Sequence, residues 1–185
     1  MKQQIVELIK SERKLSKEVR LKYFSDKSVK EIRDWFEENG LDRHLPIELN
    51  STEIVVQVPG VGILMQIRAA DKNQLGLWGG AIENGETPID GAIRELYEET
   101  GLVVKAEDLA FIELNTHKHQ YANGDIALFK SYRFALSLPH METLKLDDES
   151  NGWKVISTLE DLKSVLEHQQ DFLKKFILGS NYQGD

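Results

Sequence analysis

The sequence predicts an α/β domain that follows a helical extension at the N-terminus. Apolar side chains recur at helical spacing over residues 2–39, and the pattern changes to short strands near residue 46. One clearly bounded helix over residues 88–100 then lies between strands. The change of pattern is the expected boundary, with a helical extension over residues 1–45 and the α/β domain over 46–185.

The extension is expected to form two helices. The second should span about residues 29–39, because Ser28 and Glu31 make a capping box and Asn39-Gly40 suits a left-handed stop. Its apolar stripe needs cover, so we expect the extension to pack on the rest of the chain or on a second copy. The apolar residues of the first helix are Ile5, Leu8, Leu15, Val19 and Phe24, and those of the second are Val29, Ile32, Trp35 and Phe36.

Short runs of β-branched and aromatic residues between turn signals predict the strands. The first two are EIVVQV over 53–58 and GILMQIR over 62–68, joined by the turn Pro59-Gly60. Two more are LAFIEL over 109–114 and DIALFKSYRFAL over 125–136, and METLKL over 141–146 suggests a short fifth. An amphipathic helix from Leu159 to about Ile177 is expected to close the domain.

The helix over 88–100 is defined by local signals at both ends. Thr87 is a suitable N-cap, Pro88 takes the first helical position, Asp90 lies near the positive end of the dipole, and Gly101 suits the stop. At ~100° per residue, Glu95, Glu98 and Glu99 share one face, and the apolar stripe lies nearly opposite.

Three carboxylates on one helix face repel each other unless a cation joins them. Glutamates on an isolated helix are usually a solvated surface, but here a glycine-rich loop over 79–86 precedes the helix. Glycine permits backbone angles closed to other residues, so this loop can fold back and bring a backbone carbonyl and Glu86 to the same face. A divalent cation is the natural partner for such a cluster.

The cluster is part of a longer pattern, G-x5-E-x7-R-E-U-x-E-E-x-G-U, in which U is a bulky apolar residue. A chance match in a chain of this length is on the order of 1 in 10⁷ at ordinary residue frequencies. The pattern resembles the Nudix box, strictly over residues 80–102, and the order of elements over about 45–175 looks like that family's α/β/α sandwich around a mixed sheet. The matching residues are Gly80, Glu86, Arg94, Glu95, Leu96, Glu98, Glu99, Gly101 and Leu102.

The resemblance implies a metal-dependent hydrolase that cleaves the diphosphate linkage of a nucleoside diphosphate derivative or a nucleoside triphosphate. Mg²⁺ is the expected cofactor, with Mn²⁺ as a substitute. By resemblance, Glu98 and Glu99 are metal ligands, Glu95 is a ligand or the base, and Glu86 is a further metal-site carboxylate. The Gly80 carbonyl would add another ligand.

Arg94 lies within the box and Trp78 just before it. Arg94 suits orientation of the carboxylates, although an ordinary intrahelical pair with Glu98 is an open alternative. Trp78 stands where family members often carry proline, and we expect it to change the shape of the pocket floor.

Residues after the box supply further candidates. Glu149, in an acidic segment, is the choice for a loop-borne base, with a solvated turn as the alternative. His117 and His119 alternate on a strand, so both would face the same side and could contact substrate. Lys118 stands where ADP-ribose hydrolases of the family often carry proline. Tyr121 lies near the position of a tyrosine common in dinucleoside polyphosphate hydrolases, and it could stack on a base.

Composition limits the classes of function. The chain has no cysteine, which excludes disulfides and thiolate ligands, and its net charge of −8 disfavours nucleic acid as a partner. No apolar run approaches the ~18 residues of a membrane span, so we expect no membrane contact and a soluble, cytoplasmic protein. A small phosphorylated nucleotide is the expected partner.

Alternatives remain open at the level of sequence. A Nudix-like domain that has lost catalysis and serves as a ligand-binding regulator would lack box carboxylates, and none is missing here. An isomerase on the same scaffold would release no phosphate-containing product. The N-terminal helices give weak support for a DNA reader, and they could also form a homodimer contact or a lid.

Overall fold

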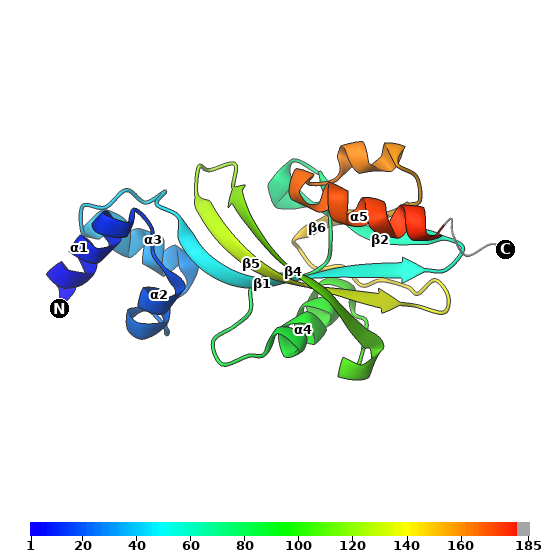
Figure 1. The fold of residues 1–185 in the computed structure, drawn as a ribbon, viewed down its shortest axis with the longest axis horizontal. Coiled ribbons are helices and arrows are strands. Elements are labelled where there is room, and N and C mark those ends of the chain that lie inside the picture. Colours follow the sequence, from blue (N-terminus) through cyan, green and yellow to red (C-terminus); the bar gives the residue numbers. More distant parts are fainter. Residues whose placement is uncertain (181–185) are drawn as a thin grey trace.

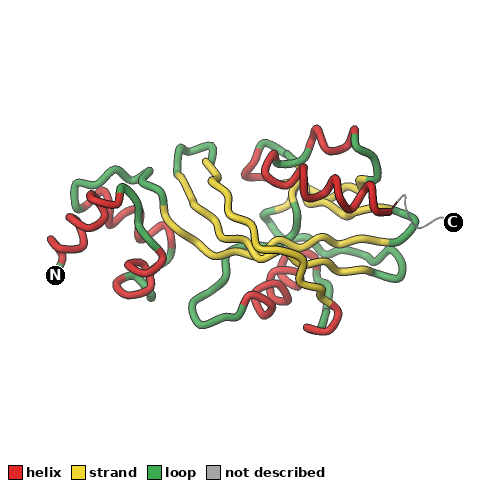
Figure 2. The backbone as a smooth tube through the Cα atoms, in the orientation of Figure 1, coloured by secondary structure: helices red, strands yellow, loops and turns green. Residues whose placement is uncertain are grey.

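The computed structural model describes residues 1–180 and places a six-stranded mixed sheet between helices. Figure 1 shows α4 on one face of the sheet, α5 on the other, and the N-terminal helices at one end; Figure 2 shows the same layers by type of structure. The α/β fold and the helical N-terminus are therefore confirmed. The helices are α1 Lys2–Glu12, α2 Lys17–Tyr23, α3 Val29–Glu38, α4 Pro88–Thr100 and α5 Glu167–Ser180. The strands are β1 Ile47–Val58, β2 Gly62–Arg68, β3 Leu75–Gly76, β4 Leu109–Gln120, β5 Ile126–Ser137 and β6 Ser150–Ile156.

β1 and β2 are paired only over a short stretch and then separate. The strand order is β3-β2-β1-β5-β4, with β6 also paired to β2. β1 pairs with β2 only over residues 56–58 but runs parallel to β5 over residues 47–57. Where β1 leaves β2, the segment 78–81 takes its place, bridging Ile54 to Trp78 and Ser51 to Ala81. This exchange lays the glycine-rich loop beside β1.

Each face of the sheet is covered by its own apolar cluster. Ile54, Val56 and Phe134 pack with Ala92 and Leu96 of α4. On the opposite face, α5 covers a cluster that includes Val55, Ile63, Met65, Phe172 and Leu173. Alternate β1 residues therefore enter opposite layers, as a strand buried on both faces requires.

The N-terminal segment forms three helices before β1, so the expectation of two was wrong. The first expected helix breaks at Arg13, which takes a left-handed conformation with φ 56°. The last matches its prediction, with the Ser28–Glu31 capping box present and Gly40 at φ 69°. These helices share one buried cluster with strand residues, including Leu15, Ile32, Phe36, Ile47, Leu49 and Ala127.

Three other expectations differ from the structure. β1 begins at Ile47, ahead of the expected residue 53. The segment 141–146 is no strand: Leu144 and Leu146 instead pack beside α4, and the Lys145 amide bonds the Thr100 carbonyl at the helix end. The sixth strand is residues 150–156, and the closing helix starts at Glu167 after a short 3-10 turn over Glu160–Ser164. Within residues 1–180, no helix is long and apolar enough to cross a membrane.

Candidate active site

α4 has the ends that its sequence predicts. The Thr87 side chain accepts a hydrogen bond from the Asp90 amide, Pro88 opens the helix, and Gly101 closes it at φ 72°. Ala92 and Leu96 are fully buried against the sheet. The helix is therefore fixed in rotation, and its carboxylates face the loop 79–86.

Glu99 is the most deeply placed of these carboxylates, with 2% of the residue exposed. Its Oε2 accepts a hydrogen bond from the Gly79 amide at 2.7 Å, and its Oε1 accepts one from Gln66 Nε2 at 3.0 Å. Burial raises the pKa of Glu99 to about 8, which the two donors only partly oppose. A buried carboxylate with neutral donors on both oxygens is well suited to receive a divalent cation, which would restore its charged form.

Arg94 holds the other box carboxylates together. Its Nε and Nη2 donate to the two Glu86 oxygens at 2.9 and 3.1 Å, and its Nη1 donates to Glu95 at 2.8 Å and to Glu98 at 3.0 Å. Nη2 also donates to the Ala81 carbonyl at 2.9 Å. The intrahelical pair with Glu98 and the orienting contacts are both present, so the two interpretations of Arg94 are not exclusive. The hydrogen bond from Arg94 is also the main reason that the pKa of Glu86 lies below its usual value.

Gly80 lies directly against this cluster. A Cβ at residue 80 would come within 2.7 Å of the Glu95 carboxylate, so a larger residue would have to displace this carboxylate from its place beside the loop. The Gly80 carbonyl accepts a hydrogen bond from the Thr52 amide at 2.9 Å, which leaves it one free lone pair for a ligand role. Burial raises the pKa of Glu95 as well.

A cavity of about 800 Å³ opens beside the cluster. It brings together most of the residues singled out in the sequence, whereas Glu86, Glu98 and Glu99 lie outside its lining. Val29, Lys30 and Arg33 of α3 form part of its wall, so the extension contributes to the cavity as well as covering apolar surface. The singled-out residues that line it are Gly80, Arg94, Glu95, His117, His119, Tyr121 and Glu149.

Trp78 does not shape the cavity floor, so that expectation was wrong. Its side chain is fully buried in the cluster beneath α4, and its Nε1 donates to the Leu64 carbonyl at 2.8 Å. Segment 78–81 pairs with β1, and alternate residues of a paired segment point to opposite sides. Trp78 therefore points into the core, while Leu77 and Gly79 reach the cavity.

The cavity wall on β4 is aromatic. His117 stacks on His168 with ring centroids 3.8 Å apart and on Phe129 at 5.3 Å. His119 meets Tyr121 edge to face at 4.6 Å. Burial lowers the pKa of His117 to about 4, so this ring is neutral at pH 7 and packs as an uncharged ring against His168 and Phe129.

The sequence reading missed a buried polar network at the base of this wall. Glu53 Oε2 accepts from Arg133 Nε at 2.7 Å, and its Oε1 lies 2.9 Å from His168 Nε2 and 2.7 Å from Gln169 Nε2. Arg133 also donates to Glu113 at 2.9 Å. The available signal was a pair of opposite charges, Glu53 and Arg133, inside runs that otherwise predict buried strands.

Glu53, His117 and His168 place three ligand-type atoms within 4.8 Å of one another, but the arrangement argues against a metal site. The two imidazoles are nearly parallel, at 12°, so their nitrogen lone pairs do not converge on one point. The Glu53 oxygens already accept hydrogen bonds from three side chains, one of them cationic. The cluster is better described as an ion-pair network that supports the cavity wall.

We predict that this network stabilises the fold in a pH-dependent way. Burial alone would raise the pKa of Glu53, but the bond from His168 and the charge of Arg133 lower it from 4.5 to about 2. Because the folded value lies below the unfolded one, the stabilisation is complete above the unfolded value, near pH 4.5, and is lost as the pH falls through about 2. It amounts to roughly 3 kcal/mol.

Urea unfolding of wild type and Glu53→Gln at pH 7 and pH 3 measures this effect. The difference in unfolding free energy between the two proteins should shrink at pH 3. Glu113→Gln is the matched control, because Glu113 also bonds Arg133 but its side chain is 35% exposed. Equal pH dependence in Glu53→Gln and wild type would contradict the assignment.

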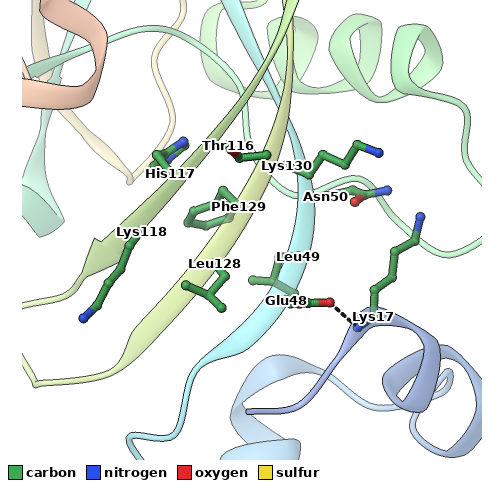
Figure 3. A pocket seen from close by; sticks show the side chains of 10 residues that line it. All are labelled: Lys17, Glu48, Leu49, Asn50, Thr116, His117, Lys118, Leu128, Phe129 and Lys130. Atoms are coloured by element: carbon green, nitrogen blue, oxygen red, sulfur yellow. Dashed lines mark hydrogen bonds between the residues drawn. The ribbon is translucent and has the colours of Figure 1, made fainter. Parts of the chain in front are cut away.

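A second hollow, of about 480 Å³, lies beside the same strands and is drawn in Figure 3. Lys17, Lys118 and Lys130 surround it, and the Lys17 amide bonds Glu48 at 2.9 Å. It includes none of the box carboxylates. The larger cavity is therefore the one placed for chemistry at a divalent cation.

Comparison with known proteins gives one consistent family. The family model described as the NUDIX domain matches residues 49–177. A MutT-like protein of Streptomyces ambofaciens is 42% identical over 66 residues, covering 33% of this chain and 43% of the relative. An RNA pyrophosphohydrolase of Bartonella quintana (strain Toulouse) is 32% identical over 102 residues, covering 47% of this chain and 58% of the relative. The chain thus spans about half the length of these curated relatives.

Solved structures share the fold at lower sequence identity. The E. coli dihydroneopterin triphosphate pyrophosphohydrolase superposes with a TM-score of 0.59 at 22% identity, covering 70% of this chain and 95% of that one. A C. elegans Ap4A hydrolase binary complex gives a TM-score of 0.56 at 23% identity, covering 72% of this chain and 98% of that one. At this identity, the likeness supports the fold alone.

Proposed function

The chain belongs to the NUDIX family, and we propose that it is a divalent-metal-dependent hydrolase that cleaves the diphosphate linkage of a nucleotide-type substrate. The observation that carries the proposal is the box cluster itself. Glu86, Glu95 and Glu98 converge on Arg94, and Glu99 lies buried on the same helix, beside an open cavity. Glutamate is rarely buried without an ion pair, and Glu99 forms no ion pair within residues 1–180, so its burial supports a role in binding a cation.

The residues present fit a hard divalent cation. Their donor set is oxygen only, which Mg²⁺ and Mn²⁺ accept. Glu98 and Glu99 would hold the ion, with Glu95, Glu86 and the Gly80 carbonyl completing the oxygen set. When bound, the cation would neutralise charge on the diphosphate and lower the pKa of a coordinated water.

The chain's own side chains supply orientation and proton transfer. Arg94 keeps Glu86, Glu95 and Glu98 in place through charge-assisted hydrogen bonds. Glu149 lines the cavity and makes no direct contact with Arg94 in the described chain. We therefore favour Glu149 as the base that takes a proton from the attacking water, with Glu95 as the alternative.

The substrate that fits best is a nucleoside triphosphate or a nucleoside diphosphate derivative. Tyr121 and Phe129 give the cavity an aromatic lining, on which a base can stack. The names of the relatives and of the similar structures, which include an RNA pyrophosphohydrolase and an Ap4A hydrolase, agree with cleavage of phosphoanhydrides. Assay of nucleoside triphosphates and nucleoside diphosphate derivatives with Mg²⁺ and Mn²⁺ tests this proposal.

We predict that Tyr121→Ala raises KM for the best nucleotide about 10-fold or more and changes kcat little. Base stacking contributes ~1–3 kcal/mol and is equal in the ground and transition states, so its loss appears in KM. Tyr121→Phe is the matched control, because it keeps the ring that meets His119, and it should stay near wild type. An unchanged KM in Tyr121→Ala, or preference for a diphosphate without a base, would refute the stacking role.

We also propose residues 1–45 as the extension and residues 46–185 as the catalytic domain. The division is supported by the position of β1, which starts at Ile47. Because α3 contributes to the cavity wall, the extension would take part in substrate binding.

A further inference from the structure

A chain of polar side chains connects the buried box carboxylate with the cavity wall. It starts at Glu99, crosses β2 and the turn after it, and ends on β4. Gln66 Nε2 donates to Glu99 at 3.0 Å, and Arg68 Nη1 donates to Gln66 Oε1 at 3.2 Å. Arg68 Nε donates to Asp71, whose other oxygen lies 3.1 Å from His119 Nε2.

The orientation of the Gln66 amide is the central feature of this chain. Gln66 is 1% exposed, so each of its polar atoms needs a partner within the protein. Its Nε2 donates to Glu99 and to Ser150 Oγ at 2.7 Å, which uses both N–H bonds. When Glu99 is in the charged form that binds a cation, the opposite orientation would turn the amide oxygen toward its carboxylate, acceptor against acceptor. Arg68 prevents this, because it is a donor on the side where the amide oxygen must lie.

Arg68 is itself held on several sides. Asp71, which is 8% exposed, accepts its Nε–H bond. The turn that carries Asp71 is closed on the Arg68 backbone, since the Asn73 amide donates to the Arg68 carbonyl and the Arg68 amide donates to the Gln74 carbonyl. Lys72 and Asn73 take left-handed conformations, at φ 54° and 63°, to make this turn. Such a conformation costs free energy in residues other than glycine and is retained when the surrounding contacts require it.

The same turn is joined to the segment that carries Glu149. The Ala69 amide donates to the Glu149 carbonyl at 3.1 Å, and Asn151 Nδ2 donates to Asn73 Oδ1 at 2.6 Å. Ser150, the second acceptor of Gln66, is the next residue after Glu149. Fixing Arg68 and its turn therefore also fixes the backbone of the favoured base.

We propose that Arg68 is a positioning residue, which acts through Gln66 to hold Glu99 in the orientation that binds the divalent cation. The proposal rests on the proposed function, because it concerns the metal-binding role of Glu99. Arg68 also lines the cavity, so direct contact with a substrate phosphate is the competing role. The two roles differ in one respect: only the positioning role changes metal binding when no substrate is present.

The test measures Mn²⁺ affinity by electron paramagnetic resonance, without substrate, in wild type, Arg68→Met and Gln66→Met. We expect each variant to bind Mn²⁺ about 10-fold more weakly, the usual size of an outer-shell effect. The double variant should lose little more than either single one, because both act through the same contact. Arg68→Lys should be intermediate, since one ammonium cannot span Asp71 and Gln66 in the way that a guanidinium does.

Arg43→Met is the matched control. Arg43 lines the same cavity but pairs with Glu37 and Asp125, far along the chain from Gln66. It should bind Mn²⁺ as wild type does. Circular dichroism and thermal unfolding check that each variant is folded. If Arg68→Met does not fold, the comparison of wild type with Arg68→Lys tests the proposal.

The outcomes separate the two proposals. If wild type binds Mn²⁺ and Arg68→Met and Arg68→Lys bind it equally well, the positioning role is overturned, and a raised KM in those variants would assign Arg68 to substrate. If wild type binds neither Mn²⁺ nor Mg²⁺, the proposed function fails, and the positioning role fails with it. Weakened Mn²⁺ binding together with a lower kcat supports both.

Discussion

Replacing Glu99 or Glu98 with glutamine is expected to lower kcat at least about 100-fold, because a catalytic metal ion contributes several kcal/mol of transition-state stabilisation. Glutamine keeps the shape of glutamate but removes the charge that holds a divalent cation. The fold should persist, since the buried apolar face of α4, with Ala92 and Leu96, is untouched. Steady-state kinetics on the best nucleotide, with thermal unfolding of the same samples, measures both effects.

Glu107→Gln is the control for this experiment. Glu107 lies outside the box, with a side chain 78% exposed that pairs only with Lys105 in the described chain. Its replacement should leave kcat unchanged. Rates near wild type in both Glu98→Gln and Glu99→Gln would show that the box cluster is not the catalytic site.

Deleting residues 1–45 is expected to yield a protein that aggregates or unfolds. Ile47, Leu49 and Ala127 are buried beneath the N-terminal helices and would become exposed together. The deletion also removes Arg33, which is 2% exposed and donates to the carbonyl of Ile126 at 2.7 Å. Size-exclusion chromatography and urea unfolding of the shortened chain would measure the loss.

A single substitution tests the same packing role with a smaller expected loss of stability. Phe36 is fully buried in the shared cluster, so Phe36→Ala should lower the unfolding free energy by about 3–5 kcal/mol. Val29→Ala is the control, because Val29 is 38% exposed, and it should cost much less. A shortened chain that stays soluble, monomeric and equally stable would refute the packing role of the extension.

The elements that could be predicted from the sequence are those whose signals are local. α4 matches at both ends because Thr87, Pro88 and Gly101 act on their own backbone. The capping box at Ser28 correctly predicted the start of α3 for the same reason. The break at Arg13 carries no such signal, since arginine rarely takes a left-handed conformation. Beyond the break, Leu15 bridges to Ile47 and is buried with it, a contact far along the chain that no local pattern describes.

In the candidate site, too, the residues with local sequence signals could be predicted, and those that depend on distant contacts could not. The spacing of the box residues predicts their shared face, because one helix and one short loop hold them all. Gln66, Arg68, Asp71 and His168 were missed, because they reach the site through strand pairing and turns that no local pattern describes. The segment 141–146 shows the opposite error: the sequence suggests a short strand there, but Leu144 and Leu146 pack beside α4 and the segment does not join the sheet.

Hydrolysis in ¹⁸O-labelled water, followed by ³¹P NMR of the products, tests the central claim most directly. Wild type with Mg²⁺ or Mn²⁺ should cleave the diphosphate linkage of a nucleotide, with ¹⁸O entering one product phosphate, and a chelator should abolish the reaction. Glu99→Gln under the same conditions should give almost no labelled product. Cleavage that survives the chelator, or proceeds equally in Glu99→Gln, would contradict metal-dependent hydrolysis at the box carboxylates.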